Sequence, residues 1–138
     1  MVNFQKEHYS YEDMLEIMRL LRAPGGCPWD AEQTHESIRR NFLEETCEAV
    51  EAIDNHDMPA LREELGDVLM QVIFHAQMEA EVGGFTMQDV IDGLCRKLVY
   101  RHPHVFSDVK VANSDEVLTN WEALKRQEKA QRSTADAI

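Results

Sequence analysis

The sequence contains few residues that break helices and few aromatic residues. Its 138 residues include only 6 Gly and 4 Pro, and aromatic residues make up 7% of the chain. Glu, Ala, Leu and Met are abundant by contrast. Because these residues favour helices, the composition argues against a β-sandwich or β-barrel and predicts a helical protein.

Cysteine and long apolar runs are also scarce. The three cysteines, Cys27, Cys47 and Cys95, are an odd number without a Cys-x-x-Cys spacing, which argues against a disulfide framework and a structural zinc site. No apolar run is long enough to span a membrane, and the N-terminus lacks the apolar core of a signal peptide. We therefore expect a reduced, cytoplasmic protein without a membrane partner.

Basic residues are outnumbered by acidic ones. The 14 Lys and Arg against 26 Asp and Glu give a formal charge of −12, which argues against binding to a nucleic-acid backbone. A phosphorylated ligand stays compatible with this charge if metal ions bridge the two. Hydrophobic residues make up 43%, enough for a packed core. We expect one domain over residues 1–138, with a loose arm at 1–10 and a tail at 133–138 that frays or begins a linker.

Apolar residues recur at helical spacing in five segments. The predicted helices span residues 11–21, 38–53, 59–82, about 87–102 and 115–132. Their expected N-caps are Ser10, Asp57, Thr86 and Ser114, and a short turn capped by Asp30 precedes the second helix. No segment has a convincing strand pattern. The predicted fold is therefore all-α, an antiparallel helical bundle of four main helices plus short helical turns.

Negative charge is concentrated in the second and third of these helices. Nine acids and one base lie between Glu44 and Asp67, which accounts for −8 of the total −12. A helical wheel separates each helix into two stripes. The expected core faces are Phe42, Leu43, Val50 and Ile53 on helix 38–53, and Leu61, Leu65, Val68, Leu69 and Val72 on helix 59–82. The other stripes are Asn41, Glu45, Glu48 and Ala52, and Glu64, Asp67, Gln71, Phe74 and Met78.

The acidic stripes are expected to face each other. The short turn at 54–57 makes the two helices antiparallel neighbours, so that Glu45 and Glu48 can lie opposite Glu64 and Asp67. Four converging carboxylates repel one another unless cations neutralise them, and oxygen ligands suit Mg²⁺ or Mn²⁺. The alternative is that these acids only form solvated helix faces, as most surface acids do.

The stripe that begins with Glu64 turns apolar at Phe74 and Met78. A solvated face does not usually become apolar within a few turns, so this stripe is expected to be covered. Two covers are possible: another chain, or an added helix of the same chain. We expect at least a dimer.

The acidic residues resemble a family signature. Glu44-Glu45-Thr46-Cys47-Glu48, followed after fifteen residues by Glu64-Leu65-Gly66-Asp67, is similar to the EExxE…ExxD signature of MazG-type all-α nucleoside triphosphate pyrophosphohydrolases. The resemblance extends over about Met14 to Arg132 and includes a GCPWDxxQTH-like loop. This loop spans Gly26 to His35, and the further matching stretches are Leu43 to Thr46, Arg62 to Asp67, Arg101 to Phe106, and Asn113 through Trp121 to Lys125.

This resemblance implies hydrolysis of a nucleoside triphosphate to the monophosphate and pyrophosphate, with Mg²⁺ dependence, oligomerisation and a house-cleaning role in the nucleotide pool. By motif position, Glu45, Glu48, Glu64 and Asp67 resemble the metal ligands. The residues that resemble nucleotide-contacting positions are Lys97, Arg101 and Trp121, and Asn41 on the acidic stripe is a further expected substrate-binding residue. A spare carboxylate, Glu44 or Glu45, is the expected acceptor for the proton of the attacking water.

Two alternatives stay open at this stage. The chain resembles the first domain of tandem-domain MazG proteins, and Ala135 to Ile138 reads as the beginning of a linker. It is therefore either one domain of a longer protein or a single-domain form. A catalytically weak assembly or regulatory domain is the competing interpretation of its function. For Trp121, core packing and stacking against a nucleobase are both compatible with the pattern.

Overall fold

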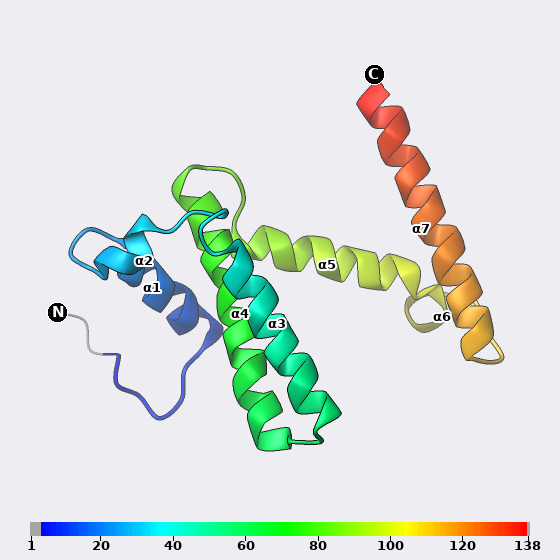
Figure 1. Cartoon of the computed structure of the whole chain (residues 1–138). Helices are drawn as coiled ribbons and strands as arrows, with labels where there is room; N and C mark the ends of the chain where they lie inside the picture. The colour runs from blue at the N-terminus through cyan, green and yellow to red at the C-terminus, as the bar shows by residue number, and fades with distance from the viewer. Residues whose placement is uncertain (1–3, 138) are drawn as a thin grey trace. The chain divides into compact units, whose positions relative to one another are not determined.

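A computed structural model describes the backbone of residues 4–137 and the side chains of residues 4–131. That part of the chain is all-α and contains no β-strand, which confirms the predicted fold class (Figure 1). The helices are α1 (Tyr11–Arg22), α2 (Pro28–Glu32), α3 (Arg39–Asp54), α4 (Met58–Glu81), α5 (Met87–Arg101), α6 (Pro103–Phe106) and α7 (Ser114–Ala137). The chain divides into two compact units, Met1–Met87 and Gln88–Ile138.

The predicted helix boundaries hold within one residue for α1, α3, α4 and α5. Helix α7 continues to Ala137, five residues beyond its expected end, and the short helix α6 was not predicted. Pro103 explains α6, because a proline cannot extend α5 but suits the first position of a new helix.

Side-chain caps account for three of the helix starts, two of which were predicted. Ser10 and Asp13 form a reciprocal capping box at α1, and Asp57 accepts a hydrogen bond from the backbone N–H of Ala60 at α4, as predicted. Two expected caps were wrong. The side chain of Asn113, not Ser114, accepts from the N–H of Glu116 at α7, and Asp30 lies within α2, which follows Cys27.

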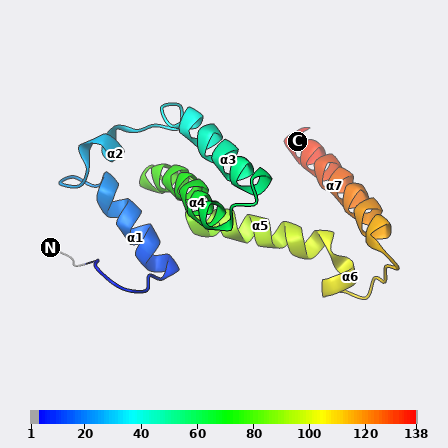
Figure 2. The same ribbon diagram turned by 60° about the horizontal axis from the view of Figure 1, so that its bottom comes forward.

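Helices α3 and α4 form an antiparallel hairpin at the centre of the first unit (Figures 1 and 2). The turn between them is only three residues long, and His56 adopts a positive φ of 52° there. A short connection forces the two helices to lie side by side. Helix α1 packs against α4 as well, so that α4 is covered on two sides.

The apolar core of this unit lies between α1 and α4. Met18 of α1, Ile38 and the α4 residues Ile73, Phe74 and Met78 are buried together. The stripe containing Phe74 and Met78 is therefore covered, as predicted, and the cover is a helix of the same chain. This stripe consequently gives no support for a dimer.

The core faces that the wheel assigned to α3 and α4 were largely wrong. Leu43, Val50 and Ile53 of α3 are 65%, 50% and 52% exposed, and Leu65 and Leu69 of α4 are 56% and 50% exposed. The buried residues of α3 are the two alanines Ala49 and Ala52. The two helices therefore meet through their acidic stripes and small residues, while the larger apolar side chains face outward.

Two polar side-chain contacts link α5 and α7 in the second unit. The Tyr100 hydroxyl donates to the Gln127 side chain, and Arg101 Nη2 lies 2.6 Å from Glu128 Oε2. Leu94 and Leu98, which were expected on the apolar face of α5, are about half exposed. Within the described part of the chain, no helix is long and apolar enough to cross a membrane.

Candidate metal centre

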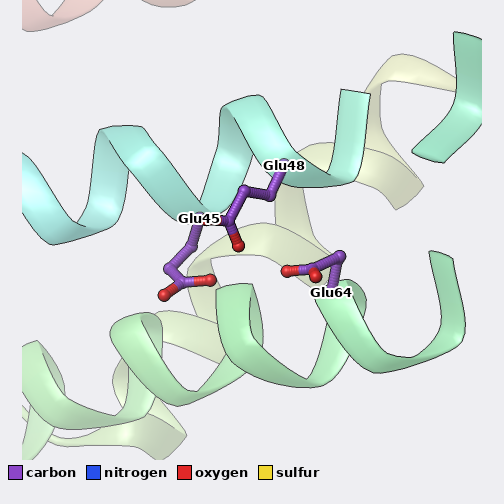
Figure 3. Close-up of side chains that lie close together, drawn as sticks. All are labelled: Glu45, Glu48 and Glu64. Carbon is purple, nitrogen blue, oxygen red and sulfur yellow. The ribbon is translucent and has the colours of Figure 1, made fainter. Parts of the chain in front are cut away.

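Three glutamates from two helices converge between α3 and α4. Glu45 and Glu48 lie one turn apart on α3, and Glu64 lies opposite them on α4 (Figure 3). One carboxylate oxygen of each residue belongs to a group whose members all lie within 4.8 Å of one another. The hairpin thus brings together three of the four predicted metal ligands.

Local sequence explains why these carboxylates can come so close. Ala49 and Ala52 are buried in the helix pair, and their small side chains allow the two backbones to approach. The Asp57 cap fixes the start of α4 directly after the turn, which sets the register of Glu64 against α3. Side chains one turn apart on α3 then project toward the same side.

The environment of the cluster is unfavourable for negative charge. Burial raises the pKa of Glu45, and the neighbouring charges of Glu48 and Asp67 raise it further. Burial, a hydrogen bond with Glu48 and the charges of Glu48, Asp67 and Glu45 raise the pKa of Glu64 from 4.5 to about 7. Without a cation, the cluster retains a proton near neutral pH.

Two oxygen atoms in the cluster lack a partner. Glu45 Oε2 and Glu64 Oε2 are buried and accept no hydrogen bond from the described residues. Buried polar atoms usually have a hydrogen-bond partner or bind an ion. Two buried carboxylate oxygens without a partner therefore indicate a binding site for a further group. Oxygen donors with negative charge fit a hard divalent cation such as Mg²⁺.

Asp67 adjoins this group without belonging to it. Its oxygens are not among the atoms that lie within 4.8 Å of one another, yet its charge raises the pKa of both Glu45 and Glu64. It therefore lies near enough to act on the cluster electrostatically. Its role as a metal ligand stays a prediction.

The other candidate residues on α3 lie at the surface. Glu44 accepts a hydrogen bond from Arg40 Nε at 3.0 Å, and its side chain is 57% exposed. Asn41 is also exposed and lies one turn before Glu45. Glu45, by contrast, is half-buried and belongs to the glutamate cluster, with its Oε2 atom buried.

The predicted nucleotide-contacting residues Lys97, Arg101 and Trp121 belong to the second unit. Lys97 is exposed, whereas Arg101 forms a partly buried ion pair with Glu128. The Lys125 ammonium lies 4.8 Å from the centroid of the Trp121 ring, and Trp121 Nε1 is buried without a hydrogen-bond partner among the described residues. Their roles in nucleotide binding stay predictions.

Sequence reasoning missed a histidine pair in the first unit. His35 Nδ1 lies 2.7 Å from His75 Nδ1, and His35 Nε2 lies 2.6 Å from Glu79 Oε2. Phe42 lies against His75, with ring centroids 5.6 Å apart. The spacing of His75 and Glu79 on α4 is visible in the sequence, but His35 is 40 residues away from His75.

Arg22 was also missed, although it connects several parts of the first unit. Its Nε and Nη2 donate to the Glu81 carboxylate at 2.9 and 3.1 Å. Its Nη1 donates to the backbone carbonyls of Asp30 and Gln33, and its guanidinium lies 5.4 Å from the Phe74 ring centroid. Arg22 thereby fixes α1 and the α2 segment to the C-terminal end of α4.

Comparison with known proteins gives a consistent result. The family model of the MazG nucleotide pyrophosphohydrolase domain matches residues 33–106. The chain is 46% identical over 125 residues to a nucleoside triphosphate pyrophosphohydrolase/pyrophosphatase MazG of Thermotoga maritima, and 48% identical over 126 residues to a nucleoside triphosphate pyrophosphohydrolase of Escherichia coli K12. Each alignment covers 91% of this chain and 48% of the relative.

Two further matches extend this result. An uncharacterized protein YabN of Bacillus subtilis is 47% identical over 133 residues, which are 95% of this chain and 27% of that protein. The crystal structure of a mazG-related protein from Thermotoga maritima superposes with a TM-score of 0.68 at 27% identity, covering 83% of this chain and 98% of that one. The chain thus spans half the length or less of these three sequence relatives. It belongs to the MazG nucleotide pyrophosphohydrolase domain family.

Proposed function

We propose that this protein hydrolyses nucleoside triphosphates to nucleoside monophosphates and pyrophosphate, in a reaction that depends on Mg²⁺ or on Mn²⁺ as a substitute. The observation that carries the proposal is the cluster of Glu45, Glu48 and Glu64, in which two buried carboxylate oxygens lack a partner. Family membership supports the same reaction class, because several relatives are named nucleoside triphosphate pyrophosphohydrolases.

Glu45, Glu48 and Glu64 are the proposed metal ligands, with Asp67 as the fourth. When bound there, Mg²⁺ supplies positive charge that polarises a phosphoryl oxygen and lowers the pKa of a bound water. A triphosphate is strongly negative and is repelled by the four carboxylates. It can bind beside them only if cations lie between the phosphates and the carboxylates. This requirement explains how a chain of charge −12 can act on a polyphosphate.

Glu45 or Glu44 is the proposed proton acceptor. A water oxygen forms a bond to the α-phosphorus, the bond to the β-phosphate oxygen breaks, and pyrophosphate leaves with the electron pair of that bond. The proton of the water passes to the carboxylate and then to solvent. Glu44 is exposed and paired with Arg40, so Glu45 is favoured.

Substrate binding is assigned to Asn41, Lys97, Arg101 and Trp121. The exposed Lys97 ammonium suits a phosphate group. Arg101 is already paired with Glu128, so that it either exchanges this partner for phosphate or positions α5 against α7. Nucleotide-pool house-cleaning in the cytoplasm is the corresponding cellular role.

A homodimer or higher homo-oligomer is proposed as the functional form. The support is the outward apolar face of the α3–α4 hairpin, which comprises Leu43, Val50, Ile53, Leu65 and Leu69. Each of these residues is at least half exposed, and exposed apolar residues on neighbouring helices offer surface that a partner chain can bury. A second copy of the hairpin suits this face, because a two-fold axis pairs the same apolar patch with itself.

The alternative function is a catalytically weak assembly or regulatory domain of a tandem-domain protein. It is favoured by one observation, that the chain spans only 27% to 48% of the three sequence relatives described above. Against it, every carboxylate of the EExxE…ExxD signature is present.

The deciding experiment incubates the purified chain with a panel of common and damaged nucleoside triphosphates, with Mg²⁺ or with EDTA, and identifies the products. We expect monophosphate and pyrophosphate with Mg²⁺ only. Glu64→Gln should lose this activity, whereas Glu63→Gln, at an exposed neighbouring glutamate, should retain it. Release of orthophosphate alone, or no product from any triphosphate, contradicts the proposal and favours the assembly domain.

A further inference from the structure

A small aromatic cavity lies at the end of the α3–α4 hairpin that is distant from the turn. Its volume is about 350 Å³, and it is lined by His35, Glu36, Arg39, Phe42 and His75. We propose that this cavity binds the nucleobase of the substrate, which stacks on the joined imidazole rings of His35 and His75. The inference rests on the proposed function and names the part of the same site that contacts the base.

The two histidine rings form one flat surface. Their planes differ by only 6°, and their centroids are 5.0 Å apart. Rings lying face to face keep their atoms about 3.5 Å apart or more, yet the two Nδ1 atoms are separated by 2.7 Å. The rings are therefore joined edge to edge by a hydrogen bond. Together they offer a planar surface similar in extent to the two fused rings of a purine.

Glu79 holds this surface in place. A carboxylate only accepts hydrogen bonds, so His35 Nε2, 2.6 Å from Glu79 Oε2, carries a hydrogen. Burial and the neighbouring His35 lower the pKa of His75, which favours the neutral form of its ring. In the uncharged pair, His75 Nδ1 donates to His35 Nδ1, and His75 Nε2 is left as an acceptor. That atom is buried and has no partner among the described residues.

The walls of the cavity suit a nucleobase as well. Phe42 is tilted by 31° relative to the His75 ring and closes one side with a second aromatic group. Glu36 and Arg39 are exposed and lie one turn apart, so that an acceptor and a donor are available for the polar edge of a base. Aromatic faces combined with a few polar groups are the usual features of sites that bind unpaired bases.

The cavity and the acidic cluster lie at different heights along the same α3–α4 hairpin. On α3, Phe42 precedes Glu45 by one turn, about 4.5 Å along the axis. On α4, His75 follows Glu64 by eleven residues, about 16 Å and three turns, which returns it to nearly the same face. Because the helices are antiparallel, both steps lead away from the 55–57 turn. A nucleotide whose phosphates lie at the acids can therefore extend its base into the cavity.

The test separates the loss of a flat surface from the loss of a histidine. His75→Leu removes the ring, and Phe42→Ala removes the wall, whereas His75→Phe keeps a flat aromatic group at the same place. We expect KM for the best triphosphate to rise about tenfold or more in His75→Leu and Phe42→Ala, and to change less than threefold in His75→Phe. His8→Leu, at an exposed histidine before α1, is the matched control. Circular dichroism confirms that each variant is folded.

A second measurement does not depend on turnover. NMR signals of the His35 and His75 rings are followed during titration with AMP, GMP, CMP and UMP, and with inorganic triphosphate as a probe that has no base. We expect the monophosphates to shift these two signals and inorganic triphosphate to leave them in place. If pyrophosphate is released but KM and the ring signals do not respond, the base pocket is wrong and the proposed function stands. If the monophosphates shift the rings but no triphosphate is hydrolysed, the proposed function fails and the pocket stands.

Discussion

The two faces of the α3–α4 hairpin have the reverse of the usual amphipathic pattern, with acidic residues on the inner face and apolar residues on the outer face. The inner face carries Glu45, Glu48 and Glu64 together with buried alanines. The outer face carries leucine, valine and isoleucine side chains that are at least half exposed. Burying carboxylates destabilises a fold, and exposing apolar side chains forgoes burial energy. Both departures make sense if a cation is bound inside and a second chain is bound outside.

Neutralising one carboxylate of the inner face should impair both metal binding and catalysis. Glu64→Gln should lower pyrophosphate release by about 100-fold or more, because a group that stabilises charge at the reacting centre is lost. The metal-free variant should nevertheless be more stable than the wild type above neutral pH, since an amide is not repelled by Glu45 and Glu48. Steady-state assays and thermal denaturation with EDTA measure the two effects. A variant that is both inactive and less stable would indicate a structural role for Glu64 instead.

A charged residue on the outer face should disrupt the proposed dimer. Leu69→Asp should raise the dissociation constant of the dimer by about 100-fold, because the carboxylate must lose its hydration at the interface. Light scattering at micromolar concentration should then report a monomer with unchanged helical content. Val82→Asp places the same charge at a side chain that is 76% exposed beyond the end of α4 and should leave the dimer intact. A monomeric wild-type protein contradicts the interface.

Lys97→Ala removes a cation that lies on α5, outside the α3–α4 hairpin. We expect turnover to fall by about tenfold, less than in Glu64→Gln, because one side-chain cation supplies only part of the charge that neutralises the phosphates. The Mg²⁺-dependent rise in melting temperature should be unchanged, because Lys97 is not among the carboxylates of the inner face. Loss of the Mg²⁺ response in this variant would show that α5 takes part in metal binding.

The pH dependence of stability gives the smallest expected effect. Folding raises the pKa of Glu64 from 4.5 to about 7, so the folded state binds this proton more tightly than the unfolded state. The resulting stabilisation is complete below about pH 4.5 and is lost as the pH rises through about 7. With EDTA, the melting temperature should therefore be lower at about pH 8 than at about pH 6, by a few degrees. Glu64→Gln should make the melting temperature depend less on pH. A wild-type melting temperature that rises from about pH 6 to about pH 8 would contradict the assignment of a raised pKa to Glu64.

Local patterns in the sequence were enough to predict the helices and part of the site. The short turn after Asp54 and the Asp57 cap specify an antiparallel pair, and the pair brings Glu45 and Glu48 opposite Glu64. The wheel failed on the core because it assumes that the widest apolar arc faces the neighbouring helix. In this hairpin small and acidic residues occupy the contact, so the assumption placed Leu43 and Leu65 inside.

Contacts distant in sequence could not be predicted. His35 and Glu79 are separated by 44 residues, and Arg22 and Glu81 by 59. Each pair forms because α1 and the segment before α3 pack against the C-terminal half of α4. No periodicity in a single helix reports that packing. The covered stripe at Phe74 was predicted, yet the covering helix α1 was identified only from the structure.

The most direct test of the inner face is the effect of Mg²⁺ on thermal unfolding. A cation that binds only the folded cluster stabilises it by an amount that grows with the logarithm of its concentration. We predict a rise in the melting temperature of the wild type and of Glu51→Gln, an exposed glutamate on α3, and no rise in Glu48→Gln at equal helical content. An equal rise in Glu48→Gln would contradict the assignment of the Glu45, Glu48 and Glu64 cluster as the metal centre.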